Sequence, residues 1–238
     1  MSVEIQNRPS TYQATKRKDQ DEMSKNILLF TDSLSLPRSQ PENCSFSNTW
    51  PELLRKNGYS VCQIAIGGAT STELLKQTFY FQSPKSEFDY VIIQSGIVDC
   101  TPRFAGKNEL KIIKSIPFLG KYLLQALNKQ WVRNLRHITY VKPSKFKKNM
   151  QQFIDLFPTS SVLFLSILPA NSDYEKKVGG ITKRIEQYNS ILLETGREID
   201  LNGIESSGIM SDFHHLNEKG HAYVLQCILQ KLNGNGEL

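Results

Sequence analysis

Four apolar runs of strand length recur along the chain, and each one stops at small or polar residues. Unbroken apolar runs of this kind are typical of strands that are buried on both faces of a parallel sheet. A weaker run at residues 198–204 predicts a short fifth strand. The four stronger strands are predicted at residues 26–30, 59–66, 89–94 and 161–168.

Segments with the spacing of amphipathic helices separate these strands. The first, at residues 48–57, has Pro51 in its first turn and Gly58 just past its end, which are common start and stop signals. Strands that alternate with helices form parallel sheets covered on both faces, so the sequence predicts a three-layer α/β/α domain. The other helices of this pattern are predicted at residues 72–78, 145–157, 181–196 and 218–232.

About sixty residues separate the third and fourth strands, far more than one crossover helix needs. Helical periodicity at residues 107–116 and 121–135 predicts a helical insertion over about residues 103–140. Because this insertion leaves the third strand at its carboxyl end, we expect it to roof that edge of the sheet. Its apolar face, with Trp131, is expected to pack on the domain while its lysines stay in water.

Residues 1–25 are polar and mixed in charge, so we expect a flexible tail before a single domain at residues 26–238. No apolar run approaches the ~20 residues that span a bilayer, and no signal-peptide pattern is present. The four cysteines are scattered without C-x-x-C spacing, which predicts neither a zinc site nor a disulfide framework. These features predict a cytoplasmic protein without a transmembrane segment.

The formal net charge is +6, and its excess is concentrated in the insertion. Between Arg103 and Lys148 there are twelve Lys or Arg residues and one acidic residue, Glu109. Such a patch attracts polyanions, anionic membrane surfaces or phosphorylated small molecules, and the alternative is a solvated helical face. An anionic substrate or surface is therefore a candidate partner, and a specific nucleic acid is not expected.

Candidate chemistry begins where the first strand ends, at the small polar triplet of residues 31–33. In an open α/β sheet, ligands bind outside the carboxyl ends of the strands. Ser33 is therefore placed to be a nucleophile, and the alternative is that Ser33 or Asp32 only caps the next helix. The loops after the next three strands bring further polar or glycine residues to the same edge, namely Gly68, Asp99 and Asn171.

Asp212 and His215 form a D-x-x-H pair just before the last predicted helix. At this spacing a carboxylate can orient one imidazole nitrogen while the other nitrogen faces a hydroxyl, which is the division of labour in a Ser-His-Asp group. The spacing alone is common by chance, and its position before the final helix is what gives it weight.

With these features in this order, the chain resembles the SGNH hydrolases, the GDSL-type esterases and lipases, over about residues 26–232. The resemblance implies a flavodoxin-like parallel sheet, with Ser33 as nucleophile, His215 as general base and Asp212 as its orienting partner. It also implies that the backbone N–H groups of Gly68 and Ser33 hold the oxyanion. No metal or organic cofactor is implied.

Two positions depart from the family pattern. Thr31 stands where the family's GDS motif has glycine, which an adjusted turn can tolerate. The family's G-x-N-D block reads Gly96-Ile97-Val98-Asp99, so Val98 replaces an asparagine that would donate to the oxyanion. Losing one such donor costs about 10²–10³ in rate.

Arg103 and Asn171 are the candidates to replace that donor, or to contact substrate or the surrounding loops. Arg103 could equally bind an anionic substrate or be solvated at the surface. Asp99 would repel an oxyanion while ionised, so we expect it to turn away and fix its loop through backbone N–H groups.

The function that these residues predict is a serine esterase that removes a small acyl group, such as acetyl, from an alcohol, with a carbohydrate ester favoured by analogy with the family. Two alternatives stay open. The same residues would make an O-acyltransferase if a glycan hydroxyl outcompetes water. A compromised oxyanion hole would instead indicate a non-catalytic protein that binds a glycan or an anion.

Overall fold

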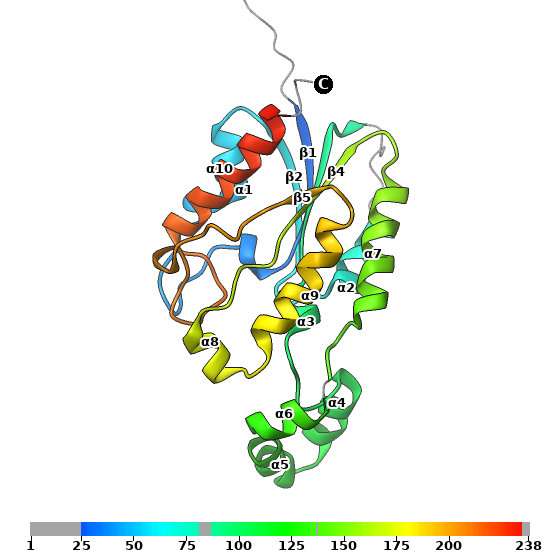
Figure 1. Cartoon of the computed structure of the whole chain (residues 1–238), viewed down its shortest axis with the longest axis vertical. Helices are drawn as coiled ribbons and strands as arrows, with labels where there is room; N and C mark the ends of the chain where they lie inside the picture. Colours follow the sequence, from blue (N-terminus) through cyan, green and yellow to red (C-terminus); the bar gives the residue numbers. More distant parts are fainter. Residues whose placement is uncertain (1–24, 81–86, 137, 235–238) are drawn as a thin grey trace, which may run out of the picture.

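A five-stranded parallel sheet runs through the middle of the molecule (Figure 1). The computed structural model describes residues 25–80, 87–136 and 138–234, so the expected flexible tail lies outside the described residues except for Lys25. The strands are β1 (Asn26–Thr31), β2 (Ser60–Ala65), β3 (Tyr90–Gln94), β4 (Ser161–Leu165) and β5 (Glu198–Ile199).

The strand order β2-β1-β3-β4-β5 is that of flavodoxin-like sheets. The chain moves one way from β1 to β2 and then the other way to β3, so the loops after β1 and β3 diverge and leave a crevice between them. Thr31 is level with Ala65 of β2 and Gln94 of β3, so the three following loops begin at the same height.

Helices cover both faces of the sheet, as the alternation predicts. The helices α1 and α10 contact each other on one face, and α2, α7 and α9 lie on the other (Figure 1). Their bounds are α1 (Trp50–Lys56), α2 (Ser71–Tyr80), α7 (Pro143–Leu156), α9 (Ile181–Leu193) and α10 (Glu218–Gly234). Shorter helices that the pattern does not predict are α3 (Ile97–Cys100), α8 (Ser172–Lys177), η1 (Ser33–Ser35), η2 (Phe46–Asn48) and η4 (Ser206–Gly208).

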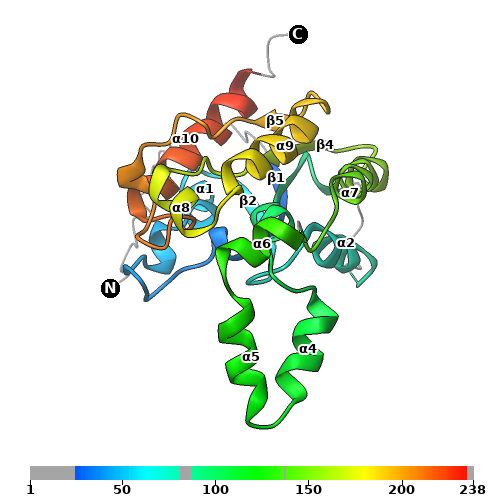
Figure 2. The same cartoon turned by 60° about the horizontal axis from the view of Figure 1, so that its bottom comes forward.

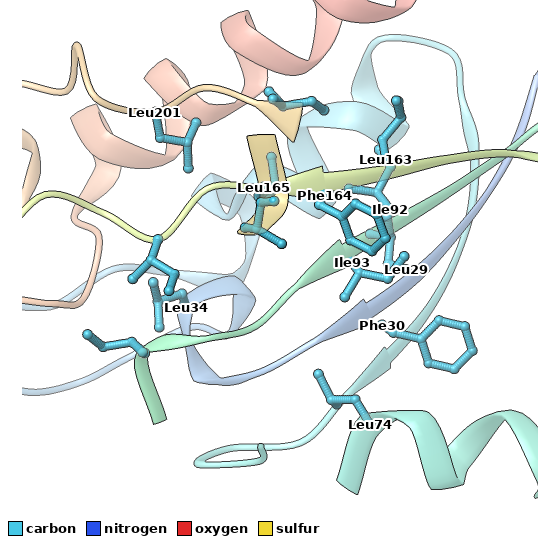
Figure 3. Close-up of a cluster of buried hydrophobic side chains, with 14 of the residues drawn as sticks. Leu29, Phe30, Leu34, Leu74, Ile92, Ile93, Leu163, Phe164, Leu165 and Leu201 are labelled. Carbon is cyan, nitrogen blue, oxygen red and sulfur yellow. The ribbon is translucent and has the colours of Figure 1, made fainter. Parts of the chain in front are cut away.

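The core lies on both sides of β1, β3 and β4 (Figure 3). Every side chain from Ile27 to Phe30 is 0% exposed, which is why the first strand reads as an unbroken apolar run. The Phe30 ring packs against Phe153 and Phe157 at the end of α7, with ring centroids 5.6 and 6.0 Å apart. This packing fixes β1, and with it the position of the loop that follows.

The fourth and fifth strands are shorter than predicted. β5 pairs only with Phe164 and Leu165, so the ladder ends there. Beyond that point a side chain replaces the backbone as acceptor, because Ser166 Oγ accepts from the Leu201 N–H at 2.8 Å. A side-chain acceptor replaces the backbone carbonyl, and both strands stop.

Three helices form the predicted insertion between β3 and β4, and its first two extend away from the sheet as a hairpin (Figure 2). They are α4 (Lys107–Ser115), α5 (Leu119–Leu127) and α6 (Gln130–Arg136). An antiparallel bridge closes the base of the insertion, where the Arg103 N–H donates to the Ile138 carbonyl at 2.8 Å. Within the described ranges, no helix combines the length and apolar composition needed to cross a bilayer.

Two expectations for the insertion are wrong. The single helix predicted at residues 121–135 is broken, because α5 ends at Leu127 and α6 begins at Gln130. Asn128 caps the end of α5, and its side-chain oxygen accepts from Arg133 of α6. Asn has a low helix propensity and favours helix ends. Trp131 is 67% exposed, so it does not pack on the domain. Trp131 lies on the short helix α6, and its side chain faces solvent instead of the domain.

Candidate active site

The polar triplet after β1 builds a tight turn that presents Ser33. Asp32 caps η1, since its Oδ1 accepts from the Leu34 N–H at 3.0 Å. The Ser35 hydroxyl donates to Thr31 Oγ1 at 2.6 Å and closes the turn from beneath. The capping role therefore belongs to Asp32, and the Ser33 hydroxyl is left to face outward.

The structure brings Ser33, His215 and Asp212 into one hydrogen-bonded chain. Ser33 Oγ lies 3.0 Å from His215 Nε2, and His215 Nδ1 lies 2.6 Å from Asp212 Oδ2. The other carboxylate oxygen of Asp212 accepts from the His215 backbone N–H at 3.0 Å. The D-x-x-H spacing thus lets one carboxylate hold both the ring and the backbone of the same histidine.

The loop that carries this pair is fixed at both ends. Ile209 and Leu216 form an antiparallel bridge, and the Met210 N–H donates to the His215 carbonyl at 2.7 Å. Phe213 takes a positive φ of 76°, which is uncommon for a residue other than glycine. This turn directs the His215 ring toward the end of β1.

The electrostatics of the loop hold His215 in its neutral form. Burial, the neighbouring His214 and the cationic Arg38 lower the pKa of His215 to about 4, although Asp212 acts in the opposite sense. Burial raises the pKa of Asp212, but hydrogen bonds from His215 and His214 hold it below its ordinary value. At neutral pH the pair is a carboxylate beside a neutral imidazole, which can accept a proton.

Arg38 is a site residue that the sequence does not indicate. Its Nη1 lies 2.8 Å from His215 Nε2, the same nitrogen that Ser33 approaches. It follows the Ser33 loop and is held by an antiparallel bridge to Cys44. No motif marks an arginine at this place, and only the return of the loop over the sheet edge brings it to His215.

Gly68 lies in the loop that follows β2, and it lines the same cleft as Ser33. The Ala69 N–H donates to the Ile66 carbonyl at 3.1 Å and closes a turn in which Gly68 has φ of +71°. A β-turn with positive φ at its third residue favours glycine. That closing hydrogen bond uses neither the Gly67 nor the Gly68 N–H, and both residues line the same cleft as Ser33.

Asp99 is buried and turned away from the cleft, as expected. Both carboxylate oxygens accept from the Ser71 N–H at 3.0 Å, and the Ser71 hydroxyl donates at 2.5 Å. Asn149 of α7 donates in turn to Ser71 Oγ at 2.8 Å. This network ties the loop after β3 to the start of α2, and so fixes α3 at the edge of the cleft.

Of the other predicted site residues, Val98 and Arg103 line the cleft and Asn171 does not. Asn171 caps α8, because its Oδ1 accepts from the Tyr174 N–H at 2.8 Å. Of the two roles that the sequence left open for Asn171, substrate contact or loop support, the structure shows the loop role. Val98 presents an apolar side chain that cannot donate a hydrogen bond.

The cleft has a volume of about 710 Å³ and joins the sheet edge to the base of the insertion. The insertion therefore lines the cleft, while most of the α4–α5 hairpin extends away from the sheet (Figure 2). The residues that the insertion and its flanks contribute to the cleft are Phe104, Ala105, Leu110, Asn128, Arg133 and Tyr140.

Among the described residues, one group has the donor atoms and spacing to hold a metal ion. Donor atoms of Asp212, His214 and His215 lie within 4.8 Å of one another. The same groups are already joined by hydrogen bonds, since His215 Nδ1 binds the Asp212 carboxylate and His214 Nδ1 lies 3.0 Å from the Asp212 carbonyl.

Comparisons with solved structures show what the fold is similar to. A lipase/acylhydrolase from Enterococcus faecalis superposes with a TM-score of 0.60 at 16% identity, covering 89% of this chain and 96% of that one. A GDSL-like lipase from Bacteroides thetaiotaomicron gives 0.53 at 13% identity, with 89% of each chain covered. An extracellular lipase from Streptomyces rimosus gives 0.55 at 16% identity, covering 87% and 99%. No protein-family model and no curated protein matches the sequence.

Proposed function

We propose that this protein, which has the fold of the SGNH and GDSL-type hydrolases, is a serine esterase that uses Ser33, His215 and Asp212. The observation that carries the proposal is the pair of contacts at His215, 3.0 Å to Ser33 Oγ and 2.6 Å to Asp212 Oδ2. A nucleophile, a base and an orienting carboxylate in this geometry are the parts of acyl transfer through a covalent intermediate.

In the first half of the reaction, neutral His215 takes the Ser33 proton through Nε2 while Oγ attacks the ester carbonyl carbon. Asp212 stabilises the imidazolium that forms. The backbone N–H groups of Ser33 and Gly68 are the proposed donors to the oxyanion, and Val98 adds none. The tetrahedral intermediate then collapses, and the leaving alcohol takes the proton from His215.

In the second half, His215 takes a proton from water as the water oxygen attacks the acyl-enzyme. Collapse of the second intermediate releases the acid and returns the proton to Ser33. Both halves require His215 Nε2 to accept from a hydroxyl. Arg38 competes for that nitrogen at 2.8 Å, so the productive state is one in which Arg38 has moved off His215.

Within this class, we propose a small acyl group, such as acetyl, on a carbohydrate alcohol as the substrate. This preference for a carbohydrate rests on analogy with hydrolases of the same fold. The acyltransferase alternative uses the same acyl-enzyme and differs only in the acceptor, so analysis of products in the presence of added sugar alcohols separates the two.

The direct test is covalent labelling with a fluorophosphonate probe, which reacts with activated serines. We expect the wild-type protein to be labelled at Ser33 and to hydrolyse 4-nitrophenyl acetate, and the Ser33→Ala variant to do neither. Ser47→Ala is the matched control, since Ser47 is exposed and its hydroxyl contacts only Ser45. Absence of labelling in folded wild-type protein would favour the non-catalytic binding protein instead.

A further inference from the structure

The cleft that contains Ser33 is lined by more positive charge than its own residues neutralise. Arg38, Arg103, Arg133 and Lys177 line it, and Asp212, which His215 already engages, is the one carboxylate among the lining residues. In the part of the chain that the structure describes, none of these four cations forms an ion pair with a carboxylate.

Arg103 and Arg133 are brought together from different elements. Arg103 follows α3 and is anchored through its backbone to Ile138, while Arg133 projects from α6. Both side chains line the same cleft. Burial lowers the pKa of the Arg133 guanidinium, and the positive charge of Arg103 lowers it further. Two like charges held in one half-buried cleft are unfavourable unless an anion joins them.

Both arginines also carry an unused donor. The Nε atoms of Arg103 and Arg133 are buried and have no hydrogen-bond partner among the described residues. A buried donor without a partner costs about 1–3 kcal/mol, so such atoms are rare in folded proteins. The face of Arg103 lies over the Tyr140 ring, 4.7 Å from the ring centroid, which holds the plane of the guanidinium.

We propose that Arg103 and Arg133 form a subsite for a phosphate monoester group, which places the substrate among phosphorylated esters. The statement that the bound phosphate group belongs to a substrate rests on the proposed esterase function. A phosphate monoester carries about −1.5 to −2 charges and three acceptor oxygens, so it can neutralise both guanidinium groups and accept from their free N–H groups. The Nη2 atom of Arg133 is already engaged, because it donates to the Asn128 side chain. A single carboxylate would leave one of the two arginines without a counter-charge.

A phosphate monoester can belong to a soluble metabolite or to a lipid headgroup. The second source is relevant because the α4–α5 hairpin next to the cleft exposes Phe118 and Tyr122, 94% and 67% accessible, among lysines. Phenyl phosphate and vesicles of phosphatidylcholine with phosphatidic acid distinguish these sources, with pure phosphatidylcholine vesicles as the control. We expect the subsite to bind the phosphoryl group of a soluble phosphate ester and that of a lipid headgroup.

The test is calorimetric titration of the full chain with inorganic phosphate. We expect binding to the wild type and a loss of at least about tenfold in affinity for Arg103→Gln and for Arg133→Gln, as expected for one charge-assisted contact. Arg136→Gln is the matched control, since it changes the same charge on the same helix but its guanidinium engages Glu109 at 2.7 Å. Circular dichroism checks that each variant folds, and Arg→Lys variants keep the charge while removing the fork.

Absence of phosphate binding to the wild type, or equal binding to all variants, would overturn the subsite. Labelling of Ser33 on the same preparation keeps this failure separate from failure of the esterase proposal. Labelling of Ser33 without phosphate binding would contradict the phosphate subsite and leave the esterase proposal intact. Phosphate binding that Arg103→Gln and Arg133→Gln weaken, in a protein that is not labelled, keeps the anion subsite and removes the esterase.

Discussion

At the scale of single residues, His215 is the group on which the proposed chemistry depends. It is 5% exposed and contacts Ser33 and Arg38 through one nitrogen and Asp212 through the other. A general base works only above its own pKa, and burial, the neighbouring His214 and the cationic Arg38 bring the pKa of His215 to about 4. The residue thus remains a base in mildly acidic solution.

We therefore expect kcat/KM for 4-nitrophenyl acetate to stay level as the pH falls toward 5, and to decline around pH 4 as His215 gains a proton. Arg38→Gln removes a positive charge that disfavours the imidazolium, so the acidic limb of the profile moves to higher pH. Arg197→Gln, which changes a residue at the amino end of β5, is the control and leaves the limb in place. A wild-type limb near pH 6.5 would show that His215 is not held neutral in this way.

At the scale of elements, the insertion has two parts with different roles. Its base closes through the Arg103–Ile138 bridge and lines the cleft. The hairpin beyond it has little core, since α4 buries no side chain and Gly120 is the one buried residue of α5. Elements that bury so little apolar surface contribute little to the free energy of unfolding.

We expect replacement of residues 107–127 by a glycine-serine linker to lower the free energy of unfolding less than Leu28→Ala does. Leu28 is 0% exposed, and a buried leucine truncated to alanine costs about 2–5 kcal/mol. The same deletion removes Leu110 from the cleft wall, so KM should change more than kcat. Urea unfolding and steady-state kinetics measure the two effects, and loss of cooperative unfolding would show that the hairpin supports the fold.

At the scale of the whole molecule, the two helices on one face of the sheet are joined through a buried histidine. His221 of α10 is 1% exposed, and its Nδ1 accepts from the Trp50 N–H at the start of α1 at 3.2 Å. Burial lowers the pKa of His221 to about 4. The D-x-x-H loop leads directly into α10, so this contact also supports the site.

Because the folded-state pKa of His221 lies below that of an exposed histidine, the unfolded chain binds more protons between about pH 6.5 and 4. The stabilisation from neutral His221 is complete above pH 6.5 and is lost as the pH falls through about 4, an effect of about 3 kcal/mol. We expect His221→Gln to be less stable at pH 7 but to show a flatter decline between pH 6.5 and 4. Urea unfolding at several pH values measures it, and an unchanged slope would contradict the assignment.

The sequence by itself determined the sheet and the core of the candidate site. An unbroken apolar run such as Ile27–Phe30 has to be buried on both faces, which specifies a parallel sheet with helices on each side. Such a sheet gathers the loops after its strands at one edge, so Ser33, Gly68, Asp212 and His215 could be assigned to one place. The strand pattern and the direction of the chain place Ser33 and Gly68 at that edge. Asp212 and His215 were added from their position before the last helix and from the resemblance to the SGNH hydrolases.

Tertiary structure alone decided how that edge is completed. Arg38 and Arg133 reach the cleft from a returning loop and from a helix of the insertion, and polar residues in such positions leave no periodic trace in the sequence. The sequence also misplaced Trp131, because an apolar stripe indicates a face that can be covered but not whether a neighbour exists to cover it. Contacts between distant segments are determined by packing geometry, and the local pattern of apolar and polar residues does not predict them.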